Sequence, residues 1–137
     1  MNLEQLWKLA AKKPSLSDNE ILKVKKCIND FLDRRDLGGR DYILTGGAAL
    51  AMHGLRKKIN DLDLVVPDMN AHRVLDRSGD YEIDAYDKYN TPIPSKLQKQ
   101  FKMIKGVRVA TKPALLALKR SLNRPKDQDD IKKLIKS

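Results

Sequence analysis

The 137-residue sequence is poor in cysteine and has no long hydrophobic run. Its single cysteine, Cys27, cannot form an internal disulfide and has no Cys or His neighbour at metal-ligand spacing, which excludes a structural zinc site and fits a reducing compartment. No apolar stretch approaches the ~18–20 residues that span a bilayer, and the N-terminus lacks the basic start and apolar stretch of a signal peptide. We therefore expect a cytoplasmic protein that does not associate with a membrane.

The chain is also too short for a second catalytic domain, because single domains usually run to about 100–200 residues. Hydrophobic residues make up 41% and charged residues 34% of the sequence, a balance that argues against disorder. We expect one domain over residues 1–137, with N-terminal helices in 1–40, a sheet in 41–110 and C-terminal helices in 111–137.

The net charge of +10 is distributed unevenly along the chain. Residues 41–90 carry six basic and nine acidic groups, whereas residues 91–137 carry thirteen basic and three acidic groups. A basic segment of this kind suits a polyanion such as nucleic acid or nucleotide phosphate, and the acidic middle can hold cations. The alternative interpretation is a basic face that is merely solvated.

Periodic apolar residues predict helices in both halves of the chain. A capping-box pattern from Ser17 to Glu20 indicates the start of one helix, and Gly38-Gly39 indicates its end. The predicted helices cover residues 2–12, 18–36, 48–53, 68–75, 113–122 and 127–136.

Alternating or short apolar runs predict strands between these helices. The strands cover residues 42–44, 61–66, 81–85 and 107–109, and two prolines mark a loop over residues 87–99. Strands interleaved with helices indicate an α/β (α+β) fold, with a small mixed β-sheet flanked by helices.

Two aspartates, Asp61 and Asp63, lie at positions i and i+2 of one predicted strand. Aspartate is disfavoured in strands, and alternate strand residues share a face at a spacing of roughly 6.5–7 Å. Magnesium binds one or two carboxylates together with substrate phosphates, and a third carboxylate, Asp84, would complete a two-ion site suited to displacement at phosphorus. Glu82 is the weaker candidate for the third position. The alternative is that all are ordinary exposed acids on a partly solvated sheet.

Gly46-Gly47 lies where a predicted strand passes into a predicted helix. Unpaired backbone amides and the helix dipole favour an anion at such a junction, and residues without side chains let a phosphate approach closely. A simple tight turn would explain the two glycines equally well.

An ordered set of short motifs connects these glycines to the acids. In chain order the motifs are Leu44-Thr45-Gly46-Gly47-Ala48, Gly54, Arg56, Asp61-Leu62-Asp63-Leu64, Ile83-Asp84-Ala85, Lys119 and Arg124-Pro125-Lys126-Asp127-Gln128-Asp129-Asp130. Over residues 42–135 this set resembles the signature of the DNA polymerase β-like nucleotidyltransferase superfamily. The greatest similarity is to small bacterial and phage members related to abortive-infection toxins and lincosamide nucleotidyltransferases.

The resemblance implies a minimal nucleotidyltransferase fold and the transfer of a nucleoside monophosphate from a nucleoside triphosphate to an acceptor hydroxyl, with pyrophosphate leaving. Carried over to this sequence, it places nucleotide binding at Thr45, Gly46, Gly47 and Lys119. It places catalysis and the binding of Mg²⁺ (or Mn²⁺) at Asp61, Asp63 and Asp84. In this scheme Asp84 also draws the proton from the acceptor.

The sequence departs from the family pattern in two places. Ile59 stands where members often carry Thr, and only about 50 residues follow the third acid, so that a homodimer could supply the missing wall of the site. Lys119 could instead lie with Arg120 on the solvated side of an amphipathic helix, and Asp127 is interpreted as a helix N-cap.

Two other functions use the same scaffold. One is a non-catalytic basic module that binds nucleic acid, and the other is a partner protein of a toxin–antitoxin pair. Three carboxylates near a phosphate site would repel a polyanion, which favours the transferase. The acceptor stays open between RNA, including the 3′ end of a transfer RNA, a protein hydroxyl and a small antibiotic.

Overall fold

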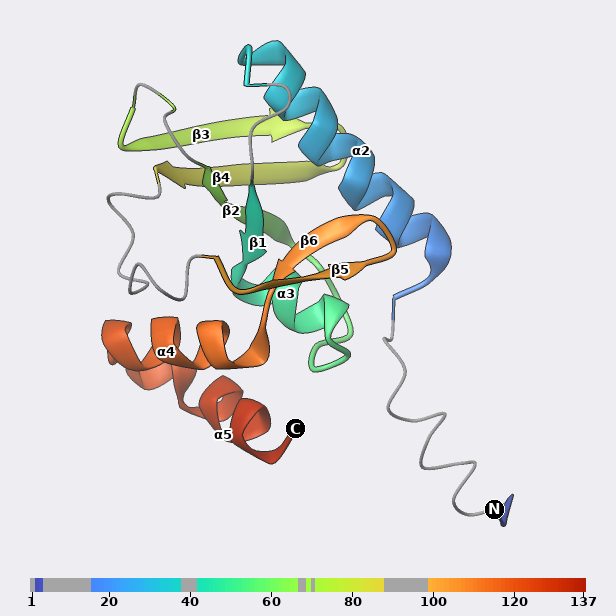
Figure 1. Cartoon of the computed structure of the whole chain (residues 1–137), viewed down its shortest axis with the longest axis vertical. Coiled ribbons are helices and arrows are strands. Elements are labelled where there is room, and N and C mark those ends of the chain that lie inside the picture. Colours follow the sequence, from blue (N-terminus) through green and yellow to red (C-terminus); the bar gives the residue numbers. More distant parts are fainter. Residues whose placement is uncertain (1, 4–15, 38–41, 67–68, 70, 88–98) are drawn as a thin grey trace.

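The centre of the protein is a six-stranded mixed β-sheet, in which the strands lie in the order β3-β4-β2-β1-β6-β5 (Figure 1). The strands are β1 (Ile43–Thr45), β2 (Asp61–Val66), β3 (Arg73–Ser78), β4 (Tyr81–Asp87), β5 (Phe101–Ile104) and β6 (Val107–Ala110). Two pairs, β2 with β4 and β1 with β6, are parallel, and the other three are antiparallel. Helices flank the sheet, so the predicted α/β fold class is confirmed.

The computed structural model describes residues 2–3, 16–37, 42–66, 69, 71–87 and 99–137. The predicted helix over residues 2–12, the predicted glycine stop at 38–39 and most of the predicted loop over 87–99 lie outside this part of the chain. Within it, no helix is long and apolar enough to cross a bilayer.

Helix α2 (Asp18–Arg34) begins where the capping-box pattern predicts. The Ser17 side chain accepts a hydrogen bond of 3.2 Å from the backbone N–H of Glu20, which satisfies one of the free donors of the first turn. The buried residues then recur at helical spacing and form one apolar stripe: Ile21, Val24, Cys27, Ile28, Phe31 and Leu32. This stripe packs on the sheet and makes much of the hydrophobic core.

Helix α2 ends earlier than predicted. Asp36 has a φ of 56°, and the backbone N–H of Leu37 donates to the carbonyl of Leu32 at 2.7 Å. This pattern closes a helix with one left-handed residue, a position that glycine usually takes. In this protein Asp36 takes the left-handed position, and a sequence rule based on glycine does not predict it.

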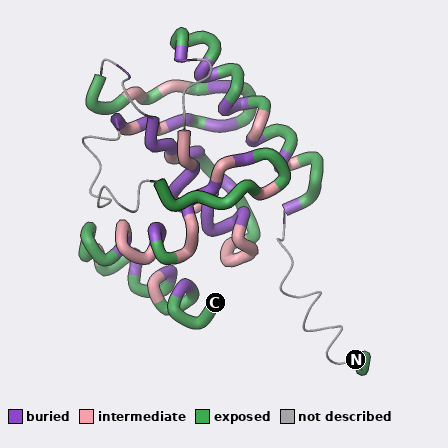
Figure 2. Tube along the Cα trace, viewed as in Figure 1, coloured by how far each residue is buried: buried purple, intermediate pink, exposed green. Residues whose placement is uncertain are grey.

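Strand β4 shows how the sheet divides its residues between two faces. Along Tyr81–Asp87 every second residue is buried, and the residues between them are exposed or half-buried (Figure 2). The buried face joins the core beneath α2, and the other face carries the acids.

Two strands differ from the sequence predictions. Residues 73–75 belong to strand β3, so the predicted helix over 68–75 is wrong there. A hairpin overrides the local preference, because Gly79, with a φ of 57°, turns the chain back and β4 supplies an antiparallel partner. Strand β5 was not predicted, because it is an edge strand whose residues are mostly exposed. Its connection to β6 uses Lys105 and Gly106, both with positive φ.

The C-terminal helices agree with prediction to within about one residue. Helix α4 (Lys112–Leu122) starts at a Thr111 side-chain cap and ends at Asn123, which has a φ of 47°. The short 3-10 helix η2 (Pro125–Asp127) leads into α5 (Gln128–Lys136). Figure 1 shows these helices together below the sheet. Helix α3 (Gly46–Met52) follows β1 directly and is almost entirely buried.

Candidate active site

A cleft of about 520 Å³ lies between the acidic face of the sheet and helix α4. The sheet contributes Asp61, Asp63, Val65, Arg73, Asp84 and Tyr86. The opposite wall consists of Leu115, Leu118, Lys119, Leu122, Arg124, Lys126 and Asp127. Thr45, Gly46, Gly47 and Arg56 complete the lining near the start of α3. All seven residues that the sequence analysis placed at the site therefore lie in one cleft.

The three acids reach the cleft from two neighbouring parallel strands. Strands β2 and β4 pair so that Asp63 lies opposite Asp84 and Asp61 lies opposite Glu82. Paired residues of adjacent strands point to the same side, so the expected common face of the acids is present. Glu82 shares this face but does not line the cleft.

The acidic wall perturbs Asp63 most strongly. Burial is the largest cause, and the charges of Asp61 and Asp84 add to it, so that the pKa of Asp63 rises to about 6. Lys119 and Arg124 on the opposite wall act in the other direction but do not outweigh these effects. The acidic wall therefore carries negative charge that a bound cation would stabilise.

Asp84 is held by two side chains of the sheet. Arg73 donates to both of its carboxylate oxygens, from Nε and Nη2, at 2.8 Å each. Tyr86 donates its hydroxyl to Oδ2 at 3.0 Å, and the Arg73 guanidinium lies 5.2 Å from the centre of the Tyr86 ring. The hydrogen bond to Asp84 raises the pKa of Arg73, and burial followed by the same carboxylate raises the pKa of Tyr86.

Sequence reasoning missed Arg73 because the predicted helix over 68–75 conceals its position on a strand beside β4, opposite Tyr86 and diagonal to the third acid. The signal that could have found it is Ser78-Gly79-Asp80, a turn sequence directly before the predicted strand over 81–85, which is typical of a hairpin. With that segment assigned as a strand, Arg73 and Asp84 become candidates for neighbouring positions on one face of a hairpin.

The two glycines make room for side chains of the site. Gly46 has a φ of 65°, and a Cβ added to it would collide with the Asp63 carboxylate. A Cβ added to Gly47 would collide with the Arg56 guanidinium. Thr45 beside them is buried, and its hydroxyl donates to the backbone carbonyl of Asp63 at 3.3 Å. Glycine is therefore required here by close packing, in addition to any approach of a phosphate.

Behind the opposite wall, three cations and two carboxylates form a network whose centre is buried. Lys119 Nζ lies 3.0 Å from Asp127 Oδ1 and 3.2 Å from Asp130 Oδ2, and all three side chains are less than a tenth exposed. Arg124 donates to Asp127 at 2.6 Å, and Arg56 donates to Asp130 at 2.7 Å. Because Arg56 comes from the loop after α3, this network ties α5 to that loop.

The network also sets the ionisation of its acids. Burial raises the pKa of Asp127, but hydrogen bonds from Arg124 and Lys119 outweigh it and bring the pKa below the ordinary value. Burial likewise raises the pKa of Asp130, and Arg56 with Lys119 brings it below the ordinary value. Both carboxylates are therefore charged at neutral pH.

These contacts decide between the sequence interpretations of the C-terminal segment. Arg120 is exposed, as expected for the solvated side of α4, whereas Lys119 is buried, so its placement on that side is wrong. Asp127 occupies the N-cap position of α5, but its side chain makes no capping hydrogen bond there and binds Lys119 and Arg124 instead. Ion pairs with the end of α4 and with the turn after it therefore take the place of the capping role.

The carboxylates of the acidic wall suit a cation that takes its other ligands from substrate phosphates and water. Among the residues that the structure describes, no cluster of three or more His, Cys, Asp and Glu side chains is arranged to hold a metal ion. Magnesium commonly binds only one or two carboxylates and takes the rest from substrate phosphates and water. Asp61, which is exposed, and Asp63 suit that mode, while Asp84 is occupied by Arg73.

No model of a known protein family and no curated protein matches this chain. The chemistry of the cleft therefore has to be argued from its own residues. One wall gathers carboxylates, and the other presents cations, of which Lys119, Arg124 and Lys126 line the cleft. A cleft of this polarity can hold an anionic ligand against the basic wall and a cation between that ligand and the acids.

Proposed function

We propose that the protein is a magnesium-dependent nucleotidyltransferase that moves a nucleoside monophosphate from a nucleoside triphosphate to an acceptor hydroxyl. The observation that carries this proposal is the single cleft in which Asp61, Asp63 and Asp84 face Lys119 and Arg124. Phosphoryl-type transfer depends mainly on positioning and on neutralising charge, and such a cleft supplies both.

The acidic wall would hold the metal. Asp61 and Asp63 lie two residues apart on β2 and line the cleft, and burial together with the charges of Asp61 and Asp84 raises the pKa of Asp63. A bound magnesium ion would neutralise the acids and the triphosphate and would polarise the reacting phosphorus. Glycine at position 46 leaves space for the Asp63 carboxylate beside the start of α3.

The basic wall would hold the phosphates. Lys119 is fixed by two carboxylates, so its ammonium group is already positioned before a ligand arrives. Arg124 and Arg56 each donate a hydrogen bond to a carboxylate, of Asp127 and Asp130 respectively, and also line the cleft. Cations held in place in this way lose little side-chain entropy when they bind an anion.

Asp84 is the third acid, and the resemblance assigns to it the proton of the acceptor hydroxyl. Arg73 and Tyr86 fix the orientation of its carboxylate. For Asp84 to accept a proton or to contact a metal, Arg73 has to release at least one of its oxygens. Arg73 is half-exposed, with 52% of its side chain accessible, so it has room to move toward a bound anion.

To test the proposal, the protein is incubated with magnesium, a cell extract and each nucleoside triphosphate in turn, labelled with ³²P at the α-phosphate. The measurement is the transfer of this label to a molecule of the extract. The wild-type protein should label one class of molecule in the extract and release pyrophosphate. The double variant Asp61→Asn/Asp63→Asn should do neither while keeping its fold. The matched control is Glu82→Gln, because this exposed acid shares the sheet face but lies outside the cleft.

Two results contradict the proposal: equal labelling by the folded double variant, or no labelling and no magnesium-dependent binding of any nucleoside triphosphate by the wild type. The second result would favour the non-catalytic nucleic-acid-binding module. One observation favours that second candidate: Arg73 engages both oxygens of Asp84, the third acid that the transferase would use.

A further inference from the structure

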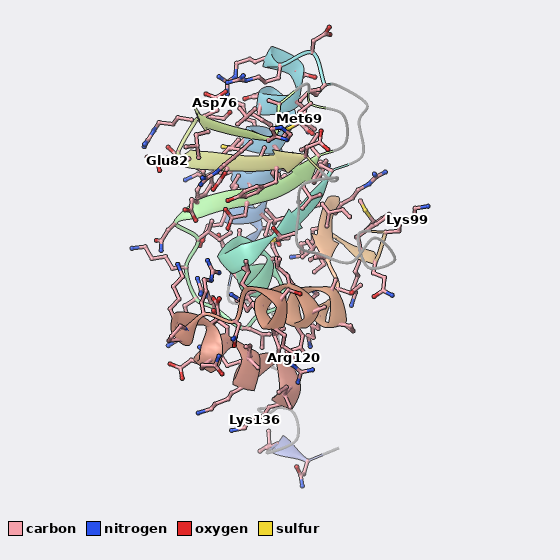
Figure 3. The ribbon with its side chains drawn as sticks, turned by 90° about the vertical axis from the view of Figure 1, so that its left-hand side faces the viewer. Met69, Asp76, Glu82, Lys99, Arg120 and Lys136 are labelled. Atoms are coloured by element: carbon pink, nitrogen blue, oxygen red, sulfur yellow. The ribbon has the colours of Figure 1, made fainter. Side chains whose placement is uncertain are left out.

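The described segment from residue 99 to residue 126 contains basic residues but no acid. It holds nine Lys and Arg residues, at positions 99, 102, 105, 108, 112, 119, 120, 124 and 126, and no Asp or Glu. Lys99, Lys102, Lys105 and Arg108 lie on or directly beside β5 and β6, at one edge of the sheet, and the other five lie on α4 and directly after it. In Figure 3 Lys99 lies toward the right-hand edge of the molecule and Glu82 toward the left-hand edge. An edge of this charge complements a polyanion.

The same edge exposes two apolar side chains beside an arginine. We call this surface the shelf and define it as Phe101, Met103 and Arg108. Phe101 is 40% exposed and Met103 is 53% exposed, although large apolar side chains are usually covered. The Arg108 guanidinium lies over the Phe101 ring, 5.1 Å from its centre. An exposed aromatic ring beside a stacked arginine is the type of surface on which single-stranded bases stack.

The shelf lies on the same face of the sheet as the acids. Phe101 pairs with Ala110, Met103 pairs with Arg108, and Thr45 pairs with Asp63. The pairing of Leu44 with Val109 places Thr45 beside Ala110, so one row of residues crosses the sheet from Asp63 to Phe101.

The length of this row sets the separation of the shelf from the cleft. It crosses the sheet from β2 through β1 and β6 to β5, which is three inter-strand steps of about 4.8 Å and therefore ~14 Å. Thr45, which also lines the cleft, and Ala110 are buried, so no exposed residue of this row joins the cleft to the shelf. A ligand that uses both has to be extended and flexible.

We infer that the shelf binds single-stranded nucleic acid. The bases would stack on Phe101, Met103 would extend the apolar contact, and Arg108 with the nearby Lys99 would contact the phosphates. A single strand fits better than a duplex because only unpaired bases offer their faces to an aromatic side chain. If the protein is the nucleotidyltransferase proposed above, the end of this strand reaches the cleft as the acceptor.

The test is fluorescence anisotropy of labelled oligonucleotides of about ten nucleotides with the full chain and no nucleoside triphosphate. Single-stranded RNA, single-stranded DNA of the same sequence and the corresponding duplex form three arms. Both single strands should bind more tightly than the duplex, and affinity should fall steeply between about 50 and about 200 mM salt because counterions are released. A preference between the two single strands identifies which sugar the shelf selects.

Three variants probe the shelf, and two serve as matched controls. Phe101→Ala should weaken binding roughly 5- to 100-fold, and Phe101→Trp should retain it because the ring still stacks. Arg108→Gln should weaken binding and reduce the salt slope by about one. The controls are Leu22→Ala and Lys23→Gln on α2, which remove an exposed apolar side chain and an exposed charge away from the shelf.

The outcomes separate this inference from the proposed function, because binding is measured without transfer. Nucleotide transfer without any binding of single strands, or binding that Phe101→Ala leaves unchanged in a folded protein, would overturn the shelf alone. Shelf-dependent binding without transfer would leave the shelf standing and overturn the transferase. If the shelf variants and the α2 controls lose affinity for the oligonucleotides equally, the binding is nonspecific attraction between charges. That result would also overturn the shelf.

Discussion

Arg73 donates one hydrogen bond to each carboxylate oxygen of Asp84, at 2.8 Å in both cases. The two residues belong to adjacent antiparallel strands, and the contact sits at the rim of the acidic wall. Arg73 therefore neutralises the third acid of the cleft, and a metal that uses Asp84 has to compete with its guanidinium.

The first prediction concerns this competition. Replacing Arg73 by Ala should increase the affinity of the cleft for Mn²⁺ several-fold, because the acids lose their nearest competing cation. Binding can be followed by the loss of the free Mn²⁺ signal in electron paramagnetic resonance. Arg77→Ala, which removes an exposed arginine of the same strand that pairs with Glu82, is the matched control and should have little effect. A weaker affinity in Arg73→Ala would mean that Arg73 supports the cation site.

The second prediction follows from the raised pKa of Asp63. Because its pKa is about 6 in the folded protein and near 3.9 in the unfolded chain, folding favours the protonated form. The unfolded state then binds fewer protons between these values, so this group makes stability fall as pH rises from about 4 to about 6. Asp63→Asn should remove that dependence and stabilise the protein at pH 7 by about 2–3 kcal/mol.

Urea denaturation of the wild type and of Asp63→Asn at several pH values measures this difference directly. The difference in unfolding free energy should grow from near zero at pH 4 to its full value above pH 6. A millimolar concentration of magnesium should reduce it at pH 7, since a bound cation stabilises the Asp63 carboxylate of the wild type. A difference that does not change with pH would contradict the assignment.

The third prediction compares the two glycines. Gly46→Ala should destabilise the fold by about 2–4 kcal/mol, because a left-handed backbone costs about 1–2 kcal/mol for alanine and the new Cβ meets the Asp63 carboxylate. Gly47→Ala should cost less, since the atom it meets is the tip of the flexible Arg56 side chain. Thermal denaturation of both variants checks the order.

A double variant separates the two causes at Gly46. Combined with Asp63→Ala, Gly46→Ala should lose the collision but keep the backbone strain, so its cost should fall toward about 1–2 kcal/mol. An unchanged cost in the double variant would show that the carboxylate already moves aside.

Gly47→Val should also block nucleotide binding, because its larger side chain has to displace Arg56 within the cleft.

The fourth prediction concerns the buried network. Lys119→Met should destabilise the protein by about 2–4 kcal/mol, because it leaves Asp127 and Asp130 buried with one cation fewer. The adjacent Arg120→Met, at an exposed position of α4, should change stability by less than about 0.5 kcal/mol. The pKa values of both acids lie below the ordinary range, so their stabilisation is present at neutral pH and is lost as pH falls below about 4. The gap between Lys119→Met and the wild type should therefore narrow in acid.

Local sequence determined much of the fold. The capping box placed the start of α2, and the alternation of Asp61 and Asp63 with leucines predicted both the strand and its two faces. These features depend on backbone capping and on the period of two residues along a strand, which neighbouring residues alone define. The same reasoning missed β3 and β5, the two edge strands, because each depends on a hairpin partner more than on its own apolar pattern.

Only the tertiary structure decided how the site residues are engaged. The sequence predicted Asp84 and Lys119 as site residues. It could not show that Arg73 donates to both carboxylate oxygens of Asp84, or that the buried ammonium group of Lys119 pairs with Asp127 and Asp130. The pairing of Asp63 with Asp84 and the docking of α4 bring together residues that are far apart in the chain. Periodicity specifies which way a side chain points from its own strand or helix, whereas register and docking specify which side chain it meets.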